Sequence, residues 1–180
     1  MADKTIRGPF GANKPITSQN VGTVAAGSAV VEYGDGVNHQ TVITVDTTLG
    51  AIASGAHGYG KLIYSFPDGS VLNVKGTYMS MALTASEVTI AADTPDIGVG
   101  TVTATGETGT TLTSTLDDIM PGQTANDCDG TNEVIESLTA LQIATAGGHD
   151  VYFNAADTWA GTDTGCAIAG TIIIEWTFVV

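Results

Sequence analysis

The sequence predicts an all-β protein: an antiparallel β-sandwich of the jelly-roll or Greek-key type with an extended N-terminal arm. The composition favours strands and tight turns, because the chain has 23 glycines, many threonines and no long segment combining Ala, Leu, Glu and Lys. Several segments alternate apolar and polar residues with a period of two, which is typical of half-buried antiparallel strands. The last segment is apolar along one whole face, and such a strand needs a second sheet to cover it.

The chain is predicted to contain an extended arm over residues 1–20 and a single sandwich domain over residues 21–180. The arm contains Pro9 and Pro15 and shows no sustained periodicity. Hydrophobic residues make up 43% of the 180 residues, which is enough for the packed core of one domain.

Two hairpins are predicted in the first half of the chain. The first joins residues 29–33 to residues 40–45 across a loop rich in glycine and Asx residues. The second joins residues 61–66 to residues 70–75 across a turn at Pro67, because proline presets φ and the glycine two residues later can adopt the positive φ that closes such a loop.

The middle of the chain continues with strand-like segments. Residues 79–84 and 87–90 alternate apolar and polar side chains, and residues 96–105 and 110–116 are strand-like but rich in glycine and threonine. Residues 133–145 fit a helical face about as well as a strand, and a short helix or irregular element is expected there.

The C-terminal segment is the clearest strand. Its even-numbered positions include Ile168, Ile172, Ile174, Trp176 and Phe178, which share one face. An exposed edge of this kind would invite aggregation, so the strand is predicted to lie in the middle of a sheet or beneath another sheet.

Charge is the strongest feature of the composition, since 5 basic residues against 19 acidic ones give a net charge of −14. The basic residues all lie in the first part of the chain: Lys4, Arg7, Lys14, Lys61 and Lys75. An acidic surface repels phosphate backbones and anionic lipids, so neither nucleic acid nor a membrane is an expected partner. The N-terminus has no apolar signal-peptide core, so we expect a soluble chain without an export signal.

The loop over residues 126–133 concentrates acids and amides, which raises the question of a cation site. It departs from the EF-hand pattern, because Ala125 stands where the first carboxylate ligand belongs. A different calcium loop would use Asp127, Asp129 and Glu133. The favoured interpretation is a solvated turn whose Asn and Asp side chains cap their own backbone, so no metal and no other cofactor is expected.

No catalytic constellation is apparent, and the protein is not expected to be an enzyme. Asp117 and Asp118 are adjacent and would face opposite ways on a strand, so they are interpreted as turn or cap residues. The three histidines have no metal-ligand spacing: His39, His57 and His149. His57 is expected in a mobile loop over residues 55–60.

Two cysteines, Cys128 and Cys166, are expected to remain thiols in a reducing cytosol, with a disulfide as the alternative. Neither has a basic neighbour in the sequence that would lower its pKa and make it a nucleophile.

One aromatic segment has a binding interpretation. Trp159, with Asn154 and Asp157 nearby, has the composition of a sugar site in which the indole stacks on the ring and the polar groups bind hydroxyls. The favoured interpretation is that Trp159 turns inward and plugs one end of the sandwich, and the sugar site is the alternative.

The segments VYFNAADTW (residues 151–159) and GTIIIEW (residues 170–176) resemble small structural proteins of tailed-bacteriophage heads, of the decoration or cement type, over roughly residues 93–180. The resemblance implies a β-sandwich, often a homotrimer, that binds the major capsid protein on the outer surface of the head. It also implies a virion protein made in the host cytoplasm, with no catalytic residues.

The arm supplies a basic element on an acidic chain. Lys4, Arg7 and Lys14, with Phe10 as an apolar anchor, are predicted to bind a neighbouring subunit or the capsid, because contact between acidic subunits needs a local positive element. The alternative is a terminus with incidental charge.

Overall fold

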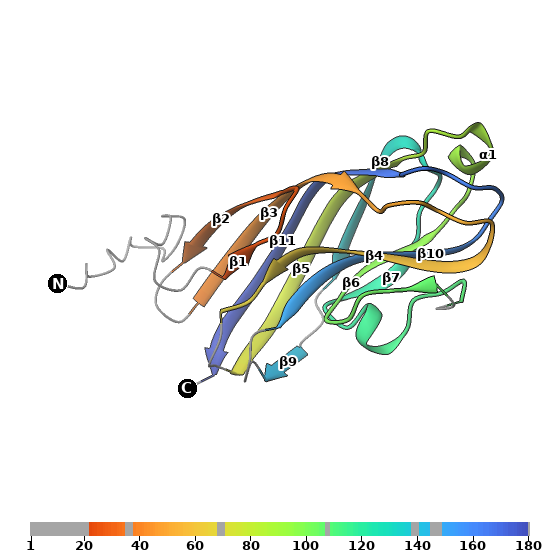
Figure 1. The fold of residues 1–180 in the computed structure, drawn as a ribbon. Coiled ribbons are helices and arrows are strands. Elements are labelled where there is room, and N and C mark those ends of the chain that lie inside the picture. Colours follow the sequence, from red (N-terminus) through yellow and green to blue (C-terminus); the bar gives the residue numbers. More distant parts are fainter. Residues whose placement is uncertain are drawn as a thin grey trace.

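The computed structural model describes residues 22–34, 38–67, 71–106, 109–137, 141–144 and 149–179, and they form two antiparallel sheets packed as a sandwich (Figure 1). The six strands of sheet A are β2 (Ser28–Gly34), β3 (Asn38–Thr48), β5 (Val71–Thr84), β8 (Asp129–Ser137), β9 (Leu141–Ala144) and β11 (Ala167–Val179). The five strands of sheet B are β1 (Thr23–Val24), β4 (Gly55–Ser65), β6 (Asp96–Gly100), β7 (Met120–Thr124) and β10 (Asp150–Trp159). The predicted arm over residues 1–20 lies outside the described residues.

The strand order is that of a jelly roll. Sheet A runs β2-β3-β11-β5-β8, with β9 also paired to β5, and sheet B runs β1-β4-β10-β6-β7. From β3 onward the chain changes sheet at each connection except β6 to β7 and β8 to β9. The predicted fold class is therefore confirmed.

The C-terminal strand β11 lies between β3 and β5, as its apolar face predicts. Ile172 stands opposite Ile43 on one side and Met79 on the other, and all three side chains are buried. The first predicted hairpin is also confirmed, because β2 pairs with β3 with Val31 opposite Val42.

The second predicted hairpin is wrong, since its two segments are strands of different sheets. β4 pairs with β1 on one side and β10 on the other, so neither of its edges is left for β5. The connection after Pro67 therefore carries the chain from sheet B to sheet A.

Three further predictions of local structure are wrong, and in the first two of them distant strand pairing decided the conformation. Residues 55–60, expected as a mobile loop, form the first part of β4, where His57 stands opposite Asp157 of β10. Of residues 133–145, the described ones are 133–137, which belong to β8, and 141–144, which form β9; both strands pair with β5 instead of forming a helix or irregular element. Residues 110–116 contain the 3-10 turn η2 (Ser114–Leu116) instead of a strand.

Two further segments predicted as strands differ in the structure. Residues 87–90 are not a strand: they lead into the single-turn helix α1 (Val88–Ala91), which buries Ile90. The strand predicted over residues 96–105 ends at Gly100 as β6. Within the part of the chain that the structure describes, no helix has the length and apolar character needed to span a membrane.

Residues 101–118, the covering segment, pack over the outer face of sheet B around Asn154 and Ala156; residues 107 and 108 of this segment are not described. Ala104 and Leu112 of this segment pack with Ala156 of β10 in a small apolar cluster separate from the main core. Asn154 of β10 fixes the segment in place: its Oδ1 accepts from the Ala104 N–H at 2.9 Å, and its Nδ2 donates to the carbonyl oxygens of Val102 at 2.9 Å and Leu116 at 2.7 Å. Asn154 lies between Gly60 and Gly98 on the neighbouring strands, and a Cβ at Gly60 would collide with its side-chain oxygen.

Candidate functional site

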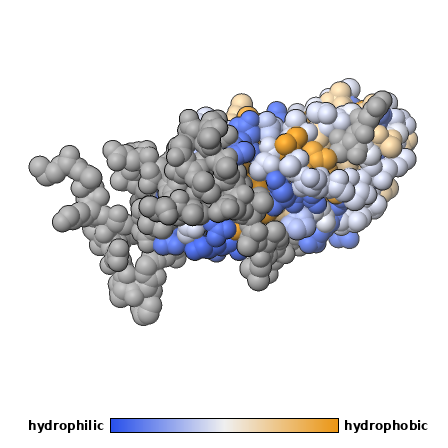
Figure 2. Space-filling view, turned by 90° about the horizontal axis from the view of Figure 1, so that it is seen from below, coloured by the Kyte–Doolittle hydropathy of each residue, from blue (hydrophilic) through white to orange (hydrophobic). Residues whose placement is uncertain are grey.

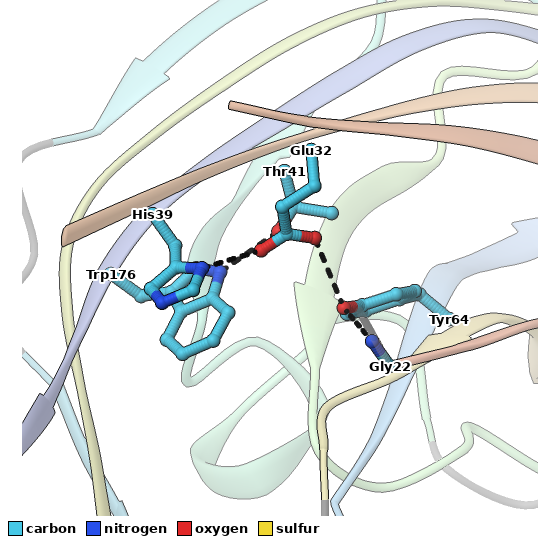
Figure 3. Close-up of polar contacts among 6 residues, drawn as sticks. All are labelled: Gly22, Glu32, His39, Thr41, Tyr64 and Trp176. Atoms are coloured by element: carbon cyan, nitrogen blue, oxygen red, sulfur yellow. Dashed lines mark hydrogen bonds and ion pairs between the residues drawn. The ribbon is translucent and has the colours of Figure 1, made fainter. Parts of the chain in front are cut away.

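A buried polar network joins the two sheets beside β1 and β2, where the described chain begins (Figure 3). We call it the edge network: Gly22, Glu32, His39, Thr41, Tyr64 and Trp176. Its members come from both layers, since Tyr64 belongs to sheet B and the strands β2, β3 and β11 belong to sheet A.

The centre of the network is the pair formed by Glu32 and His39. The two residues stand on adjacent strands, and His39 Nδ1 lies 3.0 Å from Glu32 Oε1. Their side chains are 1% and 0% exposed. The His39 ring also stacks on the indole of Trp176, with ring centroids 4.1 Å apart and an interplanar angle of 11°. The indole N–H donates to Thr41 Oγ1 at 2.8 Å, which holds Trp176 in this orientation.

The network crosses between the sheets through Tyr64. Its hydroxyl donates to Glu32 Oε2 at 3.5 Å and accepts the backbone N–H of Gly22 at 2.8 Å. Burial, reinforced by the neighbouring Glu32 carboxylate, raises the pKa of Tyr64 well above its usual value, so the phenol remains a donor at neutral pH. Figure 3 shows Glu32 between His39 and Tyr64, with Gly22 on the far side of the tyrosine hydroxyl.

The network acts as a clamp on the root of the arm. Gly22 is bonded to Tyr64, and β1 continues the attachment by pairing Thr23 with Ser65. A reacting molecule would need to reach Glu32 or His39, whose side chains have almost no exposed surface. The role available here is therefore structural: a hydrogen-bonded bridge between the sheets that fixes the position of Gly22, the first described residue.

The candidate calcium residues form turns. Asp127 Oδ1 accepts the N–H of Asp129 at 3.2 Å, and Asp129 Oδ1 accepts both the N–H and the hydroxyl of Thr131, at 3.0 and 2.7 Å. The hydrogen bond from the Thr131 hydroxyl is the main cause that lowers the pKa of the exposed Asp129. These bonds fit the predicted turn interpretation. Glu133 lies on β8, and its side chain is outside the described part of the structure. Among the residues described, no group of three or more His, Cys, Asp or Glu side chains is arranged to hold a metal ion.

Asp117 and Asp118 act as turn residues, as predicted. Asp117 Oδ2 accepts the N–H of Gly122 at 3.1 Å. Asp118 accepts the N–H of Thr101 at 2.8 Å and its hydroxyl at 2.7 Å, which ties the start of the covering segment to its end.

The three candidate sugar-binding residues do not form an open site. Trp159 is 1% exposed, its ring packs edge-on against Tyr59, and its N–H donates to the carbonyl oxygen of His57 at 2.9 Å. Asn154 is 0% exposed and is occupied by the covering segment. Asp157 is partly buried, and its Oδ1 accepts the N–H of Thr158 at 2.7 Å. Trp159 therefore takes the inward position that the sequence favoured, and these residues give no support to the sugar-binding alternative.

The two cysteines are buried thiols in contact with each other. Both side chains are 0% exposed, and both are free. The hydrogen bond that Cys128 makes with Cys166, together with burial, raises the pKa of Cys128, so this thiol is poorly suited to act as a nucleophile.

Asp163 is a buried carboxylate that the sequence did not single out. It is 4% exposed and accepts from the N–H groups of Ser86, Glu87 and Gly165 and from the Ser86 hydroxyl, at 2.7, 3.1, 2.9 and 2.6 Å. Burial acts to raise its pKa, but these hydrogen bonds outweigh burial and lower the pKa to about 2. Asp163 therefore ties the β10–β11 connection to the turn after β5.

The edge network was also missed at the sequence level, although a signal was present. Glu32 shares a face with Val30 in its strand, and His39 shares a face with Ile43 in the next. An acid and a histidine on the inward faces of one predicted hairpin indicate a buried pair. The predicted partner-binding residues, Lys4, Arg7, Phe10 and Lys14, lie outside the described residues.

No protein-family model matches the chain, and no curated protein or solved structure matches it. The function is therefore argued from the molecule itself.

Proposed function

We propose that this protein is a non-enzymatic structural component of a virus particle, a decoration or cement protein that binds the outer surface of a bacteriophage head. The observation that carries the proposal is the clamped root of the arm. Gly22 is hydrogen-bonded to Tyr64, which belongs to the buried edge network, so the residue at which the described chain begins is held in a fixed position.

Charge supports a binding role for the arm. Beyond residue 20 the chain has only Lys61 and Lys75 as basic residues against every acidic residue except Asp3. Such bodies repel one another, whereas Lys4, Arg7 and Lys14 can approach an acidic surface. Figure 2 agrees with a polar exterior, since one view of the described surface is mostly blue and white with small orange patches.

The fold supports the proposal only in general terms. Jelly rolls serve in viral capsid domains, and they also serve in lectins. The buried positions of Trp159 and Asn154 give no support to the carbohydrate-binding alternative, because an indole with 1% exposure offers no face to a sugar ring.

The proposal implies the major capsid protein as partner, a homotrimer as the assembled form and the virion as the location. Quantitative mass spectrometry of purified particles, from cells that produce the protein and the virus, tests it directly. The protein should be present in fixed ratio to the major capsid protein and should be retained through repeated washing. Its absence from such particles would remove the proposal.

A further inference from the structure

Four apolar side chains form a row across the outer face of sheet A. Val31 of β2 stands opposite Val42 of β3, Val42 opposite Ile173 of β11, and Ile173 opposite Tyr78 of β5. Their neighbours along each strand point into the core, so the row faces outward. Val31 is 45% exposed, and the other three side chains are half-buried. We call this set the apolar row.

The surroundings of the apolar row are uncharged at the centre and acidic at the margins. On one side lies a second row without charge, formed by Ala29, Thr44, Thr171 and Ser80. Beyond it stands the exposed Asp46 of β3, and on the other side stands Glu175, which accepts from Gln40 Nε2 at 3.1 Å. Lys75 is the basic exception, at the bulge of β5 near Glu175.

The outer faces of the two sheets differ in how far other parts of the chain pack over them. The covering segment packs over the outer face of sheet B around Asn154, which is 0% exposed. On the corresponding face of sheet A, Val31 remains 45% exposed, and Val42, Tyr78 and Ile173 are only half-buried. An apolar row across four strands of an acidic protein is a surface suited to another chain.

The sequence of the arm complements this surface. Ile6, Phe10 and Ile16 can fill apolar positions, and the basic residues between them, Lys4, Arg7 and Lys14, can reach carboxylates at the margins. Two copies meeting face to face would instead bring Asp46 and Glu175 of each copy near those of the other, which like-charge repulsion opposes.

The length of the arm and the place where it is attached favour the arm of a second copy as the occupant of this surface. Twenty-one residues span at most about 70 Å when extended, whereas five strands of a sheet are about 19 Å across. The arm is attached at Tyr64 and Ser65, in sheet B, and therefore starts from the layer opposite its own apolar row. We infer that the outer face of sheet A is the docking surface for the arm of a neighbouring copy of this chain. This inference rests on the proposed structural role and names one partner of the arm.

Two matched variants of the full-length protein test the docking surface. Val31 and Val102 are both exposed valines, at 45% and 46%, but Val102 lies in the covering segment on the opposite face. Val31→Lys should weaken self-association, measured by sedimentation velocity over a concentration series, by about tenfold or more, because it places an unpaired charge in an apolar contact. Val102→Lys should leave self-association unchanged. Equal effects of the two variants, or a wild-type protein that stays monomeric, would overturn the inference.

A charge exchange tests the occupant. Asp46→Lys with Glu175→Lys should weaken association, as should Lys4→Glu with Arg7→Glu and Lys14→Glu, and an equimolar mixture of the two proteins should associate as hetero-oligomers. The absence of hetero-oligomers in the mixture would reject the arm as the occupant of this surface. These measurements need no capsid, so their failure is distinguishable from absence of the protein from particles.

Discussion

The Nδ1 atom of His39 lies 3.0 Å from the Oε1 atom of Glu32, and both side chains are enclosed between the sheets. Glu32 accepts from Tyr64 and contacts His39, so its removal takes away the carboxylate that links these two side chains. Glu32→Ala should therefore lower the free energy of unfolding by about 3–5 kcal/mol, measured by urea denaturation. Replacing both residues with leucine should cost less than the sum of the single changes, because no orphaned partner remains. If the double change lowered the free energy of unfolding by the sum of the two single changes, Glu32 and His39 would not stabilise each other.

Asp163 should make the protein sensitive to acid in a defined range. Its folded pKa of about 2 lies below the unfolded value, so its stabilisation is fully present above about pH 4 and is lost as the pH falls through about 2. The contribution at neutral pH is about 2 kcal/mol. Asp163→Asn should remove most of the loss of stability between about pH 4 and 2. Thermal denaturation measured at several pH values across that range tests this. Ser86→Ala, which removes one donor, should move the loss to higher pH; an unchanged acid profile in both variants would contradict this assignment.

Asn154 should control the covering segment more than the core. Asn154→Ala removes three hydrogen bonds to backbone groups, at a cost of about 2–4 kcal/mol. Hydrogen exchange should become faster at the amide of Ala104, while the amides of β11 change less. Thr158→Ala, an exposed position on the same strand, is the control. If hydrogen exchange became faster by the same factor throughout the protein, the covering segment would not open separately from the core.

Trp159 should be a core residue in solution. Trp159→Ala is expected to lower stability by about 3–5 kcal/mol, because it leaves a cavity where the indole packs against Tyr59. Trp159→Phe should cost less but still lose the hydrogen bond to the His57 carbonyl. A stable alanine variant that had lost binding on a glycan array would instead restore the carbohydrate-binding alternative.

Deleting residues 2–15 should separate folding from assembly. The described strands all lie beyond residue 22, so the melting curve should change little. Self-association and capsid binding should be lost, because the deletion removes Lys4, Arg7, Phe10 and Lys14. If the truncated protein still self-associated and still bound the capsid, the arm would not be a binding element.

Local pattern was sufficient wherever a strand has one buried and one exposed face. The alternation around Met79 and the apolar face of residues 168–176 predicted strands and a central place for β11, and both are observed. The reason is that successive side chains of a strand point to opposite faces, so alternating apolar residues in the sequence identify the buried face directly.

Only the tertiary structure decided which strands become partners. The hairpin predicted at Pro67 is wrong because β10 and β1, distant in sequence, pair with both edges of β4. Residues 133–137 and 141–144 are strands because they pair with β5. The same holds for the sites: Trp159 turned inward, and Glu32 came to face Tyr64 from the opposite sheet. The sequence of a segment determines the period of its apolar residues. Which strand it pairs with depends on contacts between residues far apart in the chain, and the local pattern carries no information on the energies of those contacts.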